Sequence, residues 1–512
     1  MKRILALFLT AAMVLCVLSG CSSDATSAAA AASDEATASS GETTNAITVA
    51  IPQDLDSLDP YSMQAAGTRE VMFNVFEGLV KLSSDGSYVD AVAASHTISD
   101  DGLTYTFTLR DGVVFHNGQT VTVDDVVYSL ETCAATTVTE AVATALSACS
   151  VSAEGNDIIL TLDTPNSDLL AYLSNAYIVP KDYTDQATAP VGTGPFRFVS
   201  YSAADCLVVE KNTDYYGTQA YLDQVTFKVF SDKNAEITAV EAGTVDLCAH
   251  LTYDLIETLQ RDMNVLEGTM NLSVALYLNN AVTPFDNELV RQAMCYAIDV
   301  DEIMSIVNSG YGVKIGSSMF PNFGKYFDAS LADAYGYDPD KAKELLAEAG
   351  YADGFSFSIT VPSNYTNYVD MAAVIKEQLA QVGITAEITQ VEWATWLSDT
   401  YQGRSFDSTI IGFDTSVLTA GGMLERWNTD AGSNMINYSN AEYDETFAAA
   451  TASTDDAEQT ALYKRCLEIL SETAANVYMM DLPEFVVINP ALEGYEFYPL
   501  YIMDMSTIRY AG

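Results

Sequence analysis

The chain of 512 residues carries 22 Lys and Arg against 70 Asp and Glu, a formal net charge of −48 at pH 7. Proteins bind nucleic acids by neutralising phosphates with Lys and Arg, so this charge excludes DNA and RNA as partners. Domains usually contain about 100 to 200 residues, so a chain of this length is expected to fold as at least two lobes.

The first 20 residues have the pattern of a secretory signal peptide. Lys2 and Arg3 precede an apolar run from Ile4 to Leu18. This run of about 15 residues is short for a membrane-spanning helix, which needs roughly 20. The run ends in Leu18-Ser19-Gly20-Cys21, which resembles a bacterial lipobox. The resemblance implies cleavage before Cys21 and diacylglycerol on its sulfur, while an ordinary cleavage site beside an incidental cysteine is the alternative.

Residues 21–46 predict a flexible tether. After Cys21 they consist mainly of Ser, Ala, Thr and acidic residues, with no aromatic or large aliphatic side chain. Such a segment cannot form a core, and a coil of about 25 residues spans on the order of 25 to 30 Å. Cleavage before Cys21 removes Lys2 and Arg3, which leaves 20 basic and 70 acidic residues and a charge of about −50. Because anionic lipid repels such a body, the acyl chain is expected to provide the membrane attachment.

Six cysteines follow the tether and none forms a C-x-x-C motif: Cys133, Cys149, Cys206, Cys248, Cys295 and Cys466. Six cysteines can pair in 15 ways in an oxidising space. A chain of this length does not depend on disulfides for its core, so buried free thiols are the preferred interpretation.

Strands and helices interleave along the rest of the chain, which predicts an α/β fold. Alternation of apolar and polar residues, or short apolar runs, predict strands at 47–51, 104–109, 157–162, 196–199, 207–210, 225–230 and 273–278. Apolar residues at i, i+3 and i+4 predict helices at 123–130, 287–298, 338–349, 368–382 and 457–474. Pro339 lies early in its predicted helix and Gly350 closes it, as their conformational preferences favour.

No catalytic, metal or cofactor motif is found, and we expect no enzyme activity, no metal site and no cofactor. The sequence has no G-x-S-x-G, H-E-x-x-H, G-x-G-x-x-G or Walker motif. The three histidines, His96, His116 and His250, are not at metal-ligand spacing, and a hydrogen-bonding role is favoured for His116. Acidic pairs such as Asp124/Asp125 and Asp455/Asp456 are better explained as helix caps than as acid–base couples.

Five segments between residues 57 and 351 follow one another in a recognisable order. They are SLDP (57–60) with FEGL (76–79); DGLTYTFTLRDGVVFHNGQTVTVDDVVYSL (101–130); GTGPF (192–196) with YLD (221–223); LNNAVTPFDNELVRQAMCYAID (278–299); and DPDKAKELLAEAGY (338–351). Together they resemble the peptide- and nickel-type family of solute-binding proteins of ABC importers. Most of these residues have turn or cap chemistry, so they are expected to be scaffold rather than ligand contacts.

The resemblance implies a two-lobed, hinged, periplasmic-binding-protein-like fold with the ligand in a cleft between the lobes. It implies a first lobe of residues 47–277 plus 484–512, with a subdomain at about 80–189, and a second lobe of residues 278–483. Residues 486–488 would form the return crossing. The implied protein is a monomer, anchored by lipid on the outer face of the cytoplasmic membrane as in Gram-positive bacteria. It would hand a small-molecule or peptide ligand to ABC permease subunits when the lobes close.

Four residues are the candidate ligand contacts. Trp393 resembles a cleft tryptophan of peptide-binding relatives, although Trp393 and Trp396 at i, i+3 also fit a core. Gly412 and Phe413 match a strand end of the relatives, but Ser416 occupies the position where they carry the aspartate that binds the peptide ammonium. Asp414 is the nearest carboxylate, and in an extended segment it shares a face with Ser416.

These residues predict a short peptide or another amine-bearing solute as the ligand. Nickel or other metal chelates and oligosaccharides are alternative ligands for the same receptor. Two other functions remain open: a secreted, lipid-anchored hydrolase, and a receptor whose closed form engages a sensor instead of a permease.

Overall fold

The computed structural model describes residues 45–136, 140–230 and 232–512. The predicted signal peptide, Cys21 and the predicted tether up to residue 44 lie outside the described residues. No helix in the described part of the chain is long and apolar enough to cross a membrane.

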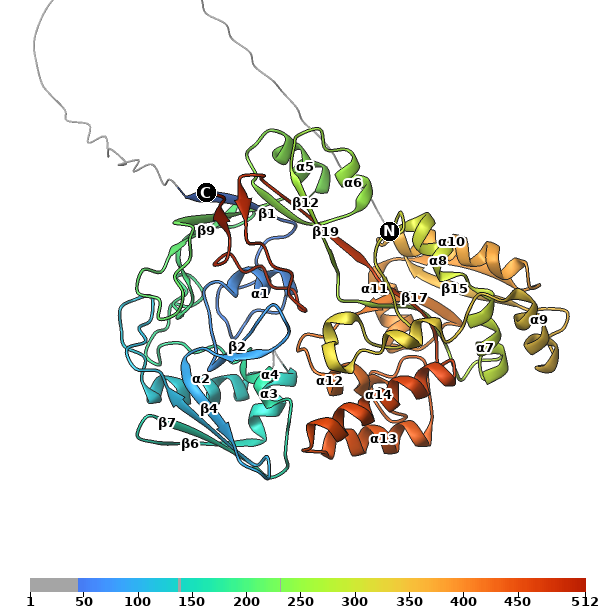
Figure 1. The fold of residues 1–512 in the computed structure, drawn as a ribbon, viewed down its shortest axis with the longest axis horizontal. Helices are drawn as coiled ribbons and strands as arrows, with labels where there is room; N and C mark the ends of the chain where they lie inside the picture. The colour runs from blue at the N-terminus through green and yellow to red at the C-terminus, as the bar shows by residue number, and fades with distance from the viewer. Residues whose placement is uncertain (1–44, 137–139, 231) are drawn as a thin grey trace, which may run out of the picture. The chain divides into compact units, whose positions relative to one another are not determined.

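A mixed sheet of seven strands forms the centre of what we call the first lobe, residues 45–269 and 483–512 (Figure 1). Its strands, in spatial order, are β12 (Asn264–Thr269), β19 (Pro483–Ile488), β11 (Leu247–Leu251), β1 (Ala46–Ile51), β10 (Gln224–Val229), β9 (Cys206–Lys211) and β8 (Phe196–Ser202). Helices α1 (Ala66–Met72), α5 (Lys233–Glu241) and α6 (Tyr253–Glu257) belong to the same lobe. Apolar residues of β1 contribute to cores on both faces of this sheet.

A four-stranded antiparallel sheet with its own core forms a subdomain of the first lobe. Its strands, in spatial order, are β4 (Ala93–Ile98), β5 (Thr104–Leu109), β7 (Asp157–Leu162) and β6 (Cys149–Glu154), and its helices are α2 (Val123–Ala135), α3 (Glu140–Ser147) and α4 (Leu169–Leu173). Strands β2 (Val80–Leu82) and β3 (Tyr88–Asp90) pair beside it. Helix α2 begins where predicted because Thr122 and Asp125 form a capping box.

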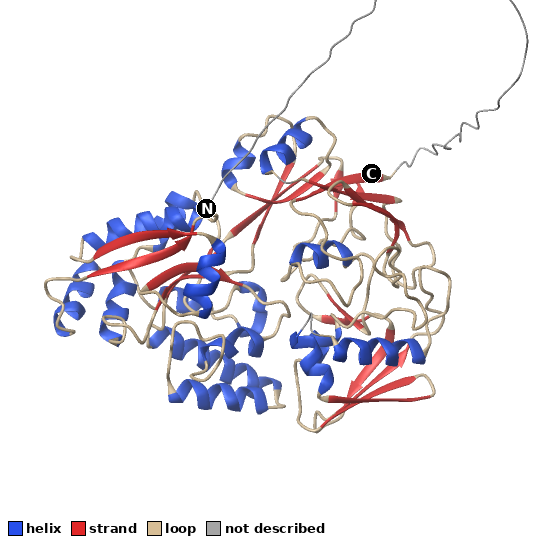
Figure 2. Cartoon of the chain, turned by 180° about the vertical axis from the view of Figure 1, so that it is seen from behind, coloured by secondary structure: helices blue, strands red, loops and turns tan. Residues whose placement is uncertain are grey.

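The second lobe, residues 273–481, is built on a six-stranded sheet with helices packed around it (Figure 2). The strands, in spatial order, are β14 (Val313–Lys314), β18 (Val477–Asp481), β13 (Ser273–Leu278), β17 (Ser408–Phe413), β15 (Ser356–Pro362) and β16 (Thr385–Val391). The α-helices are α7 (Glu288–Ala297), α8 (Val300–Val307), α9 (Pro339–Glu348), α10 (Thr366–Ala380), α11 (Trp393–Thr395), α12 (Ala420–Leu424), α13 (Ala441–Ala452) and α14 (Asp456–Glu472). The lobe also has the 3-10 helices η1 (Pro321–Tyr326), η2 (Ala329–Asp333) and η4 (Glu425–Trp427) and the π-helix η3 (Trp396–Gln402).

Local sequence signals account for these elements. The predicted strands and helices are confirmed, with ends that differ by a few residues. Asp338 caps α9 through the Lys341 N–H, Pro339 is its first residue, and Gly350 follows its end with a φ of 91°. Asp455 caps α14 in the same manner, through the Glu458 N–H. One residue of each acidic pair therefore takes part in a helix cap, as predicted: Asp125 in the capping box of α2 and Asp455 at the start of α14.

Two neighbouring segments cross between the lobes. One joins β12 to β13 and the other joins β18 to β19. The Met270 N–H donates to Leu482 O at 2.8 Å, which ties the two segments together. The expected boundary at residue 277 is wrong in one respect: all six residues of β13 are buried in the second sheet, between β17 and β18, so the first crossing lies at 270–272. An apolar run cannot show from sequence alone which of two sheets contains it.

The chain stays in the first lobe after β19. Its last segment carries β20 (Leu492–Glu493) and β21 (Arg509–Tyr510) and packs beside α1. The Asn74 side chain donates to Met503 O at 2.8 Å and accepts from the Met505 N–H at 2.8 Å. This segment therefore runs past the crossing strands and is held there by buried hydrogen bonds.

The cysteines agree with the preferred interpretation. Cys248, Cys295 and Cys466 are buried and form no disulfide. Cys149 and Cys206 are partly exposed and are also without a disulfide partner. Burial raises the pKa of the Cys295 thiol to about 12, which keeps it protonated at neutral pH.

Candidate functional site

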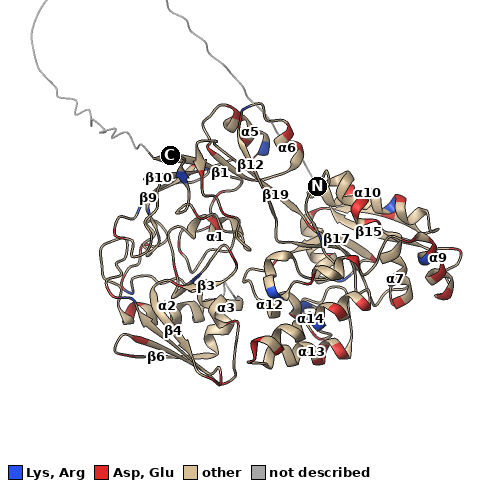
Figure 3. Cartoon of the chain, in the orientation of Figure 1, with Lys and Arg blue, Asp and Glu red and all other residues tan. Residues whose placement is uncertain are grey.

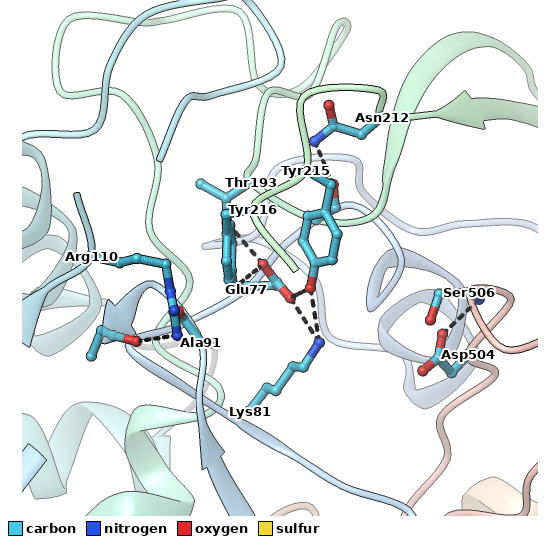
Figure 4. A network of polar contacts seen from close by, with 12 residues as sticks. Glu77, Lys81, Ala91, Arg110, Thr193, Asn212, Tyr215, Tyr216, Asp504 and Ser506 are labelled. Atoms are coloured by element: carbon cyan, nitrogen blue, oxygen red, sulfur yellow. Dashed lines mark hydrogen bonds and ion pairs between the residues drawn. The ribbon is translucent and has the colours of Figure 1, made fainter. Parts of the chain in front are cut away.

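The motif residues of the first lobe form scaffold rather than a ligand site. Buried Glu77 accepts hydrogen bonds from the Tyr215 hydroxyl at 2.6 Å, the Tyr216 hydroxyl at 2.7 Å and the Lys81 ammonium at 3.1 Å (Figure 4). Burial alone would lower the pKa of Lys81, but Glu77 and Tyr215 outweigh it and hold this pKa above its usual value. The network fixes the strand β2 region against the loop after β9.

The turn at residues 192–194 is fixed in the same way. A Cβ on Gly194 would lie 2.5 Å from Asn74 O, so only glycine permits this approach of two backbone segments. His116 accepts from the Gly192 N–H at 3.2 Å and its Nε2 lies 3.0 Å from Gly194 O. Burial lowers the pKa of His116 to about 4, so it is neutral at pH 7. The hydrogen-bonding role predicted for His116 is confirmed.

An aromatic cavity of about 370 Å³ lies at the end of β17 in the second lobe. Trp393 is 40% exposed and stacks on buried Trp396, with ring centroids 5.1 Å apart and an interplanar angle of 11°. Tyr365 meets Trp393 edge to face at 5.7 Å. Trp396 also donates its indole N–H to Thr409 Oγ1 at 2.9 Å, so it holds the exposed ring in place. Such a surface suits an apolar or aromatic group.

A second, more polar cavity of about 260 Å³ adjoins the first and is lined from both lobes. Asp414, Thr415 and Ser416 line it from the loop after β17, and Arg69 lines it from α1. The Nη1 of Arg69 donates to Gln64 O at 2.6 Å, and the other two guanidinium nitrogen atoms have no hydrogen-bond partner among the described residues. A carboxylate and a guanidinium therefore share one cavity, on opposite lobes.

Asp414 and Tyr501 line both cavities and so mark where they join. Tyr501 belongs to the C-terminal segment of the first lobe. Burial, followed by the negative charges of Asp414, Glu484 and Glu70, raises the pKa of Tyr501 above its usual value, so its hydroxyl stays protonated. It supplies a neutral donor beside the Asp414 carboxylate.

The four residues singled out from sequence are brought together. Trp393, Phe413 and Asp414 line the aromatic cavity, and Asp414 and Ser416 line the polar one. The strand ends at Phe413, so Asp414 and Ser416 lie in a loop rather than in an extended strand. Phe413 is covered on one face by Arg426, whose guanidinium carbon is 4.1 Å from the ring centroid.

Several lining residues were missed by the sequence analysis, among them Arg69, Tyr365 and Tyr501. Arg69 and Tyr501 come from segments far from β17 in sequence. The one available signal was for Arg69, because basic residues are few and an arginine in an otherwise acidic chain is worth testing as an anion contact.

A buried ion triad lies next to this site, near the crossing strands. His250 donates from Nε2 to Glu70 at 2.8 Å and from Nδ1 to Glu484 at 2.7 Å. Burial opposes charging of this imidazole, but the two carboxylates outweigh it and raise the pKa of His250 well above its usual value. His250 is therefore an imidazolium at neutral pH. Elsewhere in the described chain acidic residues are spread over many elements and basic residues are sparse (Figure 3).

Comparison with known proteins agrees with this architecture. The family model for bacterial extracellular solute-binding proteins, family 5 (middle region), matches residues 87–435. The glutathione-binding protein GsiB of Salmonella paratyphi A is 28% identical over 460 residues, which cover 83% of this chain and 86% of that protein. Heme-binding protein A of Haemophilus influenzae is 28% identical over 542 residues, which cover 95% of this chain and 96% of that protein.

A solved structure shows the same fold. The periplasmic binding protein DppA of Helicobacter pylori, in complex with the peptide STSA, superposes with a TM-score of 0.72 at 26% identity, covering 91% of this chain and 98% of that one. The expected two-lobed α/β fold is thereby confirmed, and these relatives are named as binding proteins. The family model spans more than half of the chain, so the chain belongs to the family 5 extracellular solute-binding proteins, the solute receptors of ABC importers.

Proposed function

We propose that this protein captures a short peptide, or another small amine-bearing solute with a carboxylate and an apolar group, and delivers it to an ABC permease. One observation carries the proposal: Asp414 lies where the aromatic cavity and the polar cavity join, with Arg69 lining the polar cavity from the other lobe.

The chemistry of the two cavities is complementary to such a solute. The Asp414 carboxylate suits an ammonium group and the Arg69 guanidinium suits a carboxylate, since charge-assisted hydrogen bonds are about twice as strong as neutral ones. The stacked Trp393 offers its face to an apolar or aromatic side chain. The named ligands of DppA and GsiB, a peptide and glutathione, have both an amine and a carboxylate. Ser416 supplies a hydroxyl at the position where the peptide-binding relatives carry the aspartate, so Asp414 provides the carboxylate here.

Delivery follows from the arrangement of the two lobes. Asp414 and Arg69 come from different lobes, so one solute contacts both only when they are close together. The solute then shifts the population towards the closed form, which the permease recognises. The paired segments at 270–272 and 482 are the hinge in this proposal.

We also propose that a lipid on Cys21 anchors the protein to the outer face of the cytoplasmic membrane. A body with a charge of about −50 has no other means of attachment to anionic lipid. Cys21→Ala should therefore appear in the culture medium or remain unprocessed. Normal processing with membrane retention after a high-salt wash would contradict the anchor.

The ligand proposal is tested by calorimetry with the dipeptide Ala-Phe and two analogues. Acetylation of its amine should abolish the contribution of Asp414, and amidation of its carboxylate should abolish that of Arg69. Asp414→Asn should weaken Ala-Phe at least about tenfold, which corresponds to roughly 1.4 kcal/mol. Asp430→Asn, an exposed aspartate of the same lobe, is the matched control.

Two results would reject the ligand class. One is equal affinity of the wild type and Asp414→Asn for Ala-Phe. The other is native mass spectrometry of the purified protein showing an enclosed solute without a cationic nitrogen, such as a sugar or a metal chelate. The receptor function of the fold would remain in either case.

A further inference from the structure

A third cavity, of about 520 Å³, shares no lining residue with the two described above. From the first lobe it is lined by residues 85–88, 167, 168, 170 and 171. From the second lobe it is lined by residues 322–326, 418–420, 456 and 459. The loop after β17 separates it from the polar cavity, because residues 414–416 line one and residues 418–420 line the other. Any occupant of this cavity contacts both lobes.

Asp168 is the unusual group in this cavity. It precedes α4, lines the cavity, and its carboxylate has no hydrogen bond or ion pair with any described residue. Burial raises the pKa of Asp168 to about 6, against the opposing charge of Lys325. At neutral pH a partly buried carboxylate therefore faces the cavity without a partner, and such groups are rare unless something binds them.

Tyrosine rings surround this carboxylate. Tyr88 and Tyr326 line the cavity, and the rings of Tyr326 and Tyr463 meet edge to face at 5.5 Å. Burial and the charge of Asp168 both raise the pKa of Tyr463 above its usual value. Asp168 Oδ2 and the Tyr463 hydroxyl lie 3.2 and 3.0 Å from the position that a Cβ of Gly421 would take, so both groups converge on one spot.

The surroundings already accommodate a cation. The Lys325 ammonium lies 5.0 Å from the centroid of the Tyr326 ring and pairs with Asp456. Three carboxylates, those of Asp85, Asp168 and Asp456, line the cavity against the one ammonium of Lys325. Aromatic rings together with a net negative charge are the features that recognise organic cations.

We propose that this cavity is a second binding site, for an alkylammonium cation held by the Asp168 carboxylate and the surrounding tyrosine rings. The site is distinct from the one that binds the transported solute. Because its walls come from both lobes, occupancy favours the form in which the lobes are close together.

The test uses choline and its uncharged isostere 3,3-dimethylbutan-1-ol. Saturation-transfer NMR and calorimetry on the mature protein should show binding of choline at least about tenfold tighter than binding of the alcohol. Asp168→Asn should remove this difference, whereas Asp163→Asn, an exposed aspartate of the same subdomain, should preserve it. Tyr326→Leu provides a second variant that reduces choline binding while leaving the carboxylate in place.

Three outcomes would overturn the proposal: equal binding of choline and the alcohol, no choline binding at all, or choline binding that survives both Asp168→Asn and Tyr326→Leu. Asp414→Asn distinguishes this site from the solute site. Choline affinity unchanged in Asp414→Asn supports a separate site, and its loss there would place choline in the first site and refute the second.

Discussion

Asp481 lies at the end of β18, where the chain crosses between the lobes, and its side chain is fully buried. Oδ1 accepts from the Leu272 N–H at 2.9 Å, and Oδ2 has no hydrogen-bond partner among the described residues. Burial raises the pKa of this carboxyl to about 7, from 3.8. The folded state therefore holds the proton more tightly than the unfolded state, and it loses stability as the pH rises from about 4 to about 7.

Asp481→Asn preserves the shape of the neutral carboxyl and removes this titration. Each pH unit between the two pKa values changes the free energy of unfolding by about 1.4 kcal/mol. Between about pH 5 and pH 8 the Asn variant should therefore gain roughly 2 to 3 kcal/mol in free energy of unfolding relative to the wild type. Above pH 8 the difference should stay constant, because Asp481 is then ionised in both states.

Urea denaturation of wild type and variant, followed by tryptophan fluorescence at pH 5, 6.5 and 8, measures this difference. Subtracting the free energy of unfolding of one protein from that of the other at each pH cancels the contributions of the titrating groups that both proteins share. Asp163→Asn, exposed to solvent, controls for loss of an acidic residue. A stability difference that stays the same from pH 5 to pH 8 would refute the assignment of a neutral carboxyl at the crossing.

Three further predictions concern positions described above. Gly194→Ala should lower the free energy of unfolding by at least about 2 kcal/mol, whereas Gly432→Ala, with nothing within 4 Å, should be nearly neutral; equal melting temperatures would contradict this. Trp396→Ala should lower the free energy of unfolding by about 3 to 5 kcal/mol, and Trp393→Ala should lower it far less, because only the first ring is buried. Equal destabilisation of the two variants in chemical denaturation would contradict this and show that the exposed ring also stabilises the fold. His250→Gln should cost about 3 to 5 kcal/mol at pH 6, since it leaves two carboxylates without their cation. The pKa of His250 is raised in the folded state, so its charge stabilises the fold fully below about pH 6.5, the pKa of an unfolded histidine. This stabilisation is lost as the pH rises through the pKa of the folded state. The difference in stability between the wild type and His250→Gln should therefore become smaller at alkaline pH.

Much of the fold could be predicted because local signals agree with the final structure. Alternating residues identified β5 and β7, and the Asp338-Pro339 pair marked the start of α9. The lobe to which β13 belongs could not be predicted, because a fully apolar strand fits the centre of either sheet. Its assignment depends on pairing with β17, which lies more than a hundred residues later in the chain.

The candidate site was only partly predictable for the same reason. Trp393, Phe413, Asp414 and Ser416 lie on one lobe, and their order in the sequence was enough to group them. Arg69 comes from α1 and Tyr501 from the segment that follows β19, both in the first lobe. A linear pattern does not show that the fold brings these two segments next to the end of β17. The tyrosines around Asp168 are separated in sequence by up to several hundred residues, so only the fold reveals them.

Val417 belongs by sequence to the second lobe, yet its side chain is 5% exposed and packs in the core of the subdomain of the first lobe. Beside it the Tyr88 hydroxyl donates to Leu418 O at 3.3 Å. The loop that carries Asp414 and Ser416 is thus held against the first lobe by the buried Val417 side chain and by this hydrogen bond. Exposing a buried valine side chain to water costs about 1.5 to 3 kcal/mol. This contact therefore favours the form in which Val417 is buried over one in which it is exposed by a factor of roughly 10 to 150. Any movement that separates the two lobes therefore has to break this contact first.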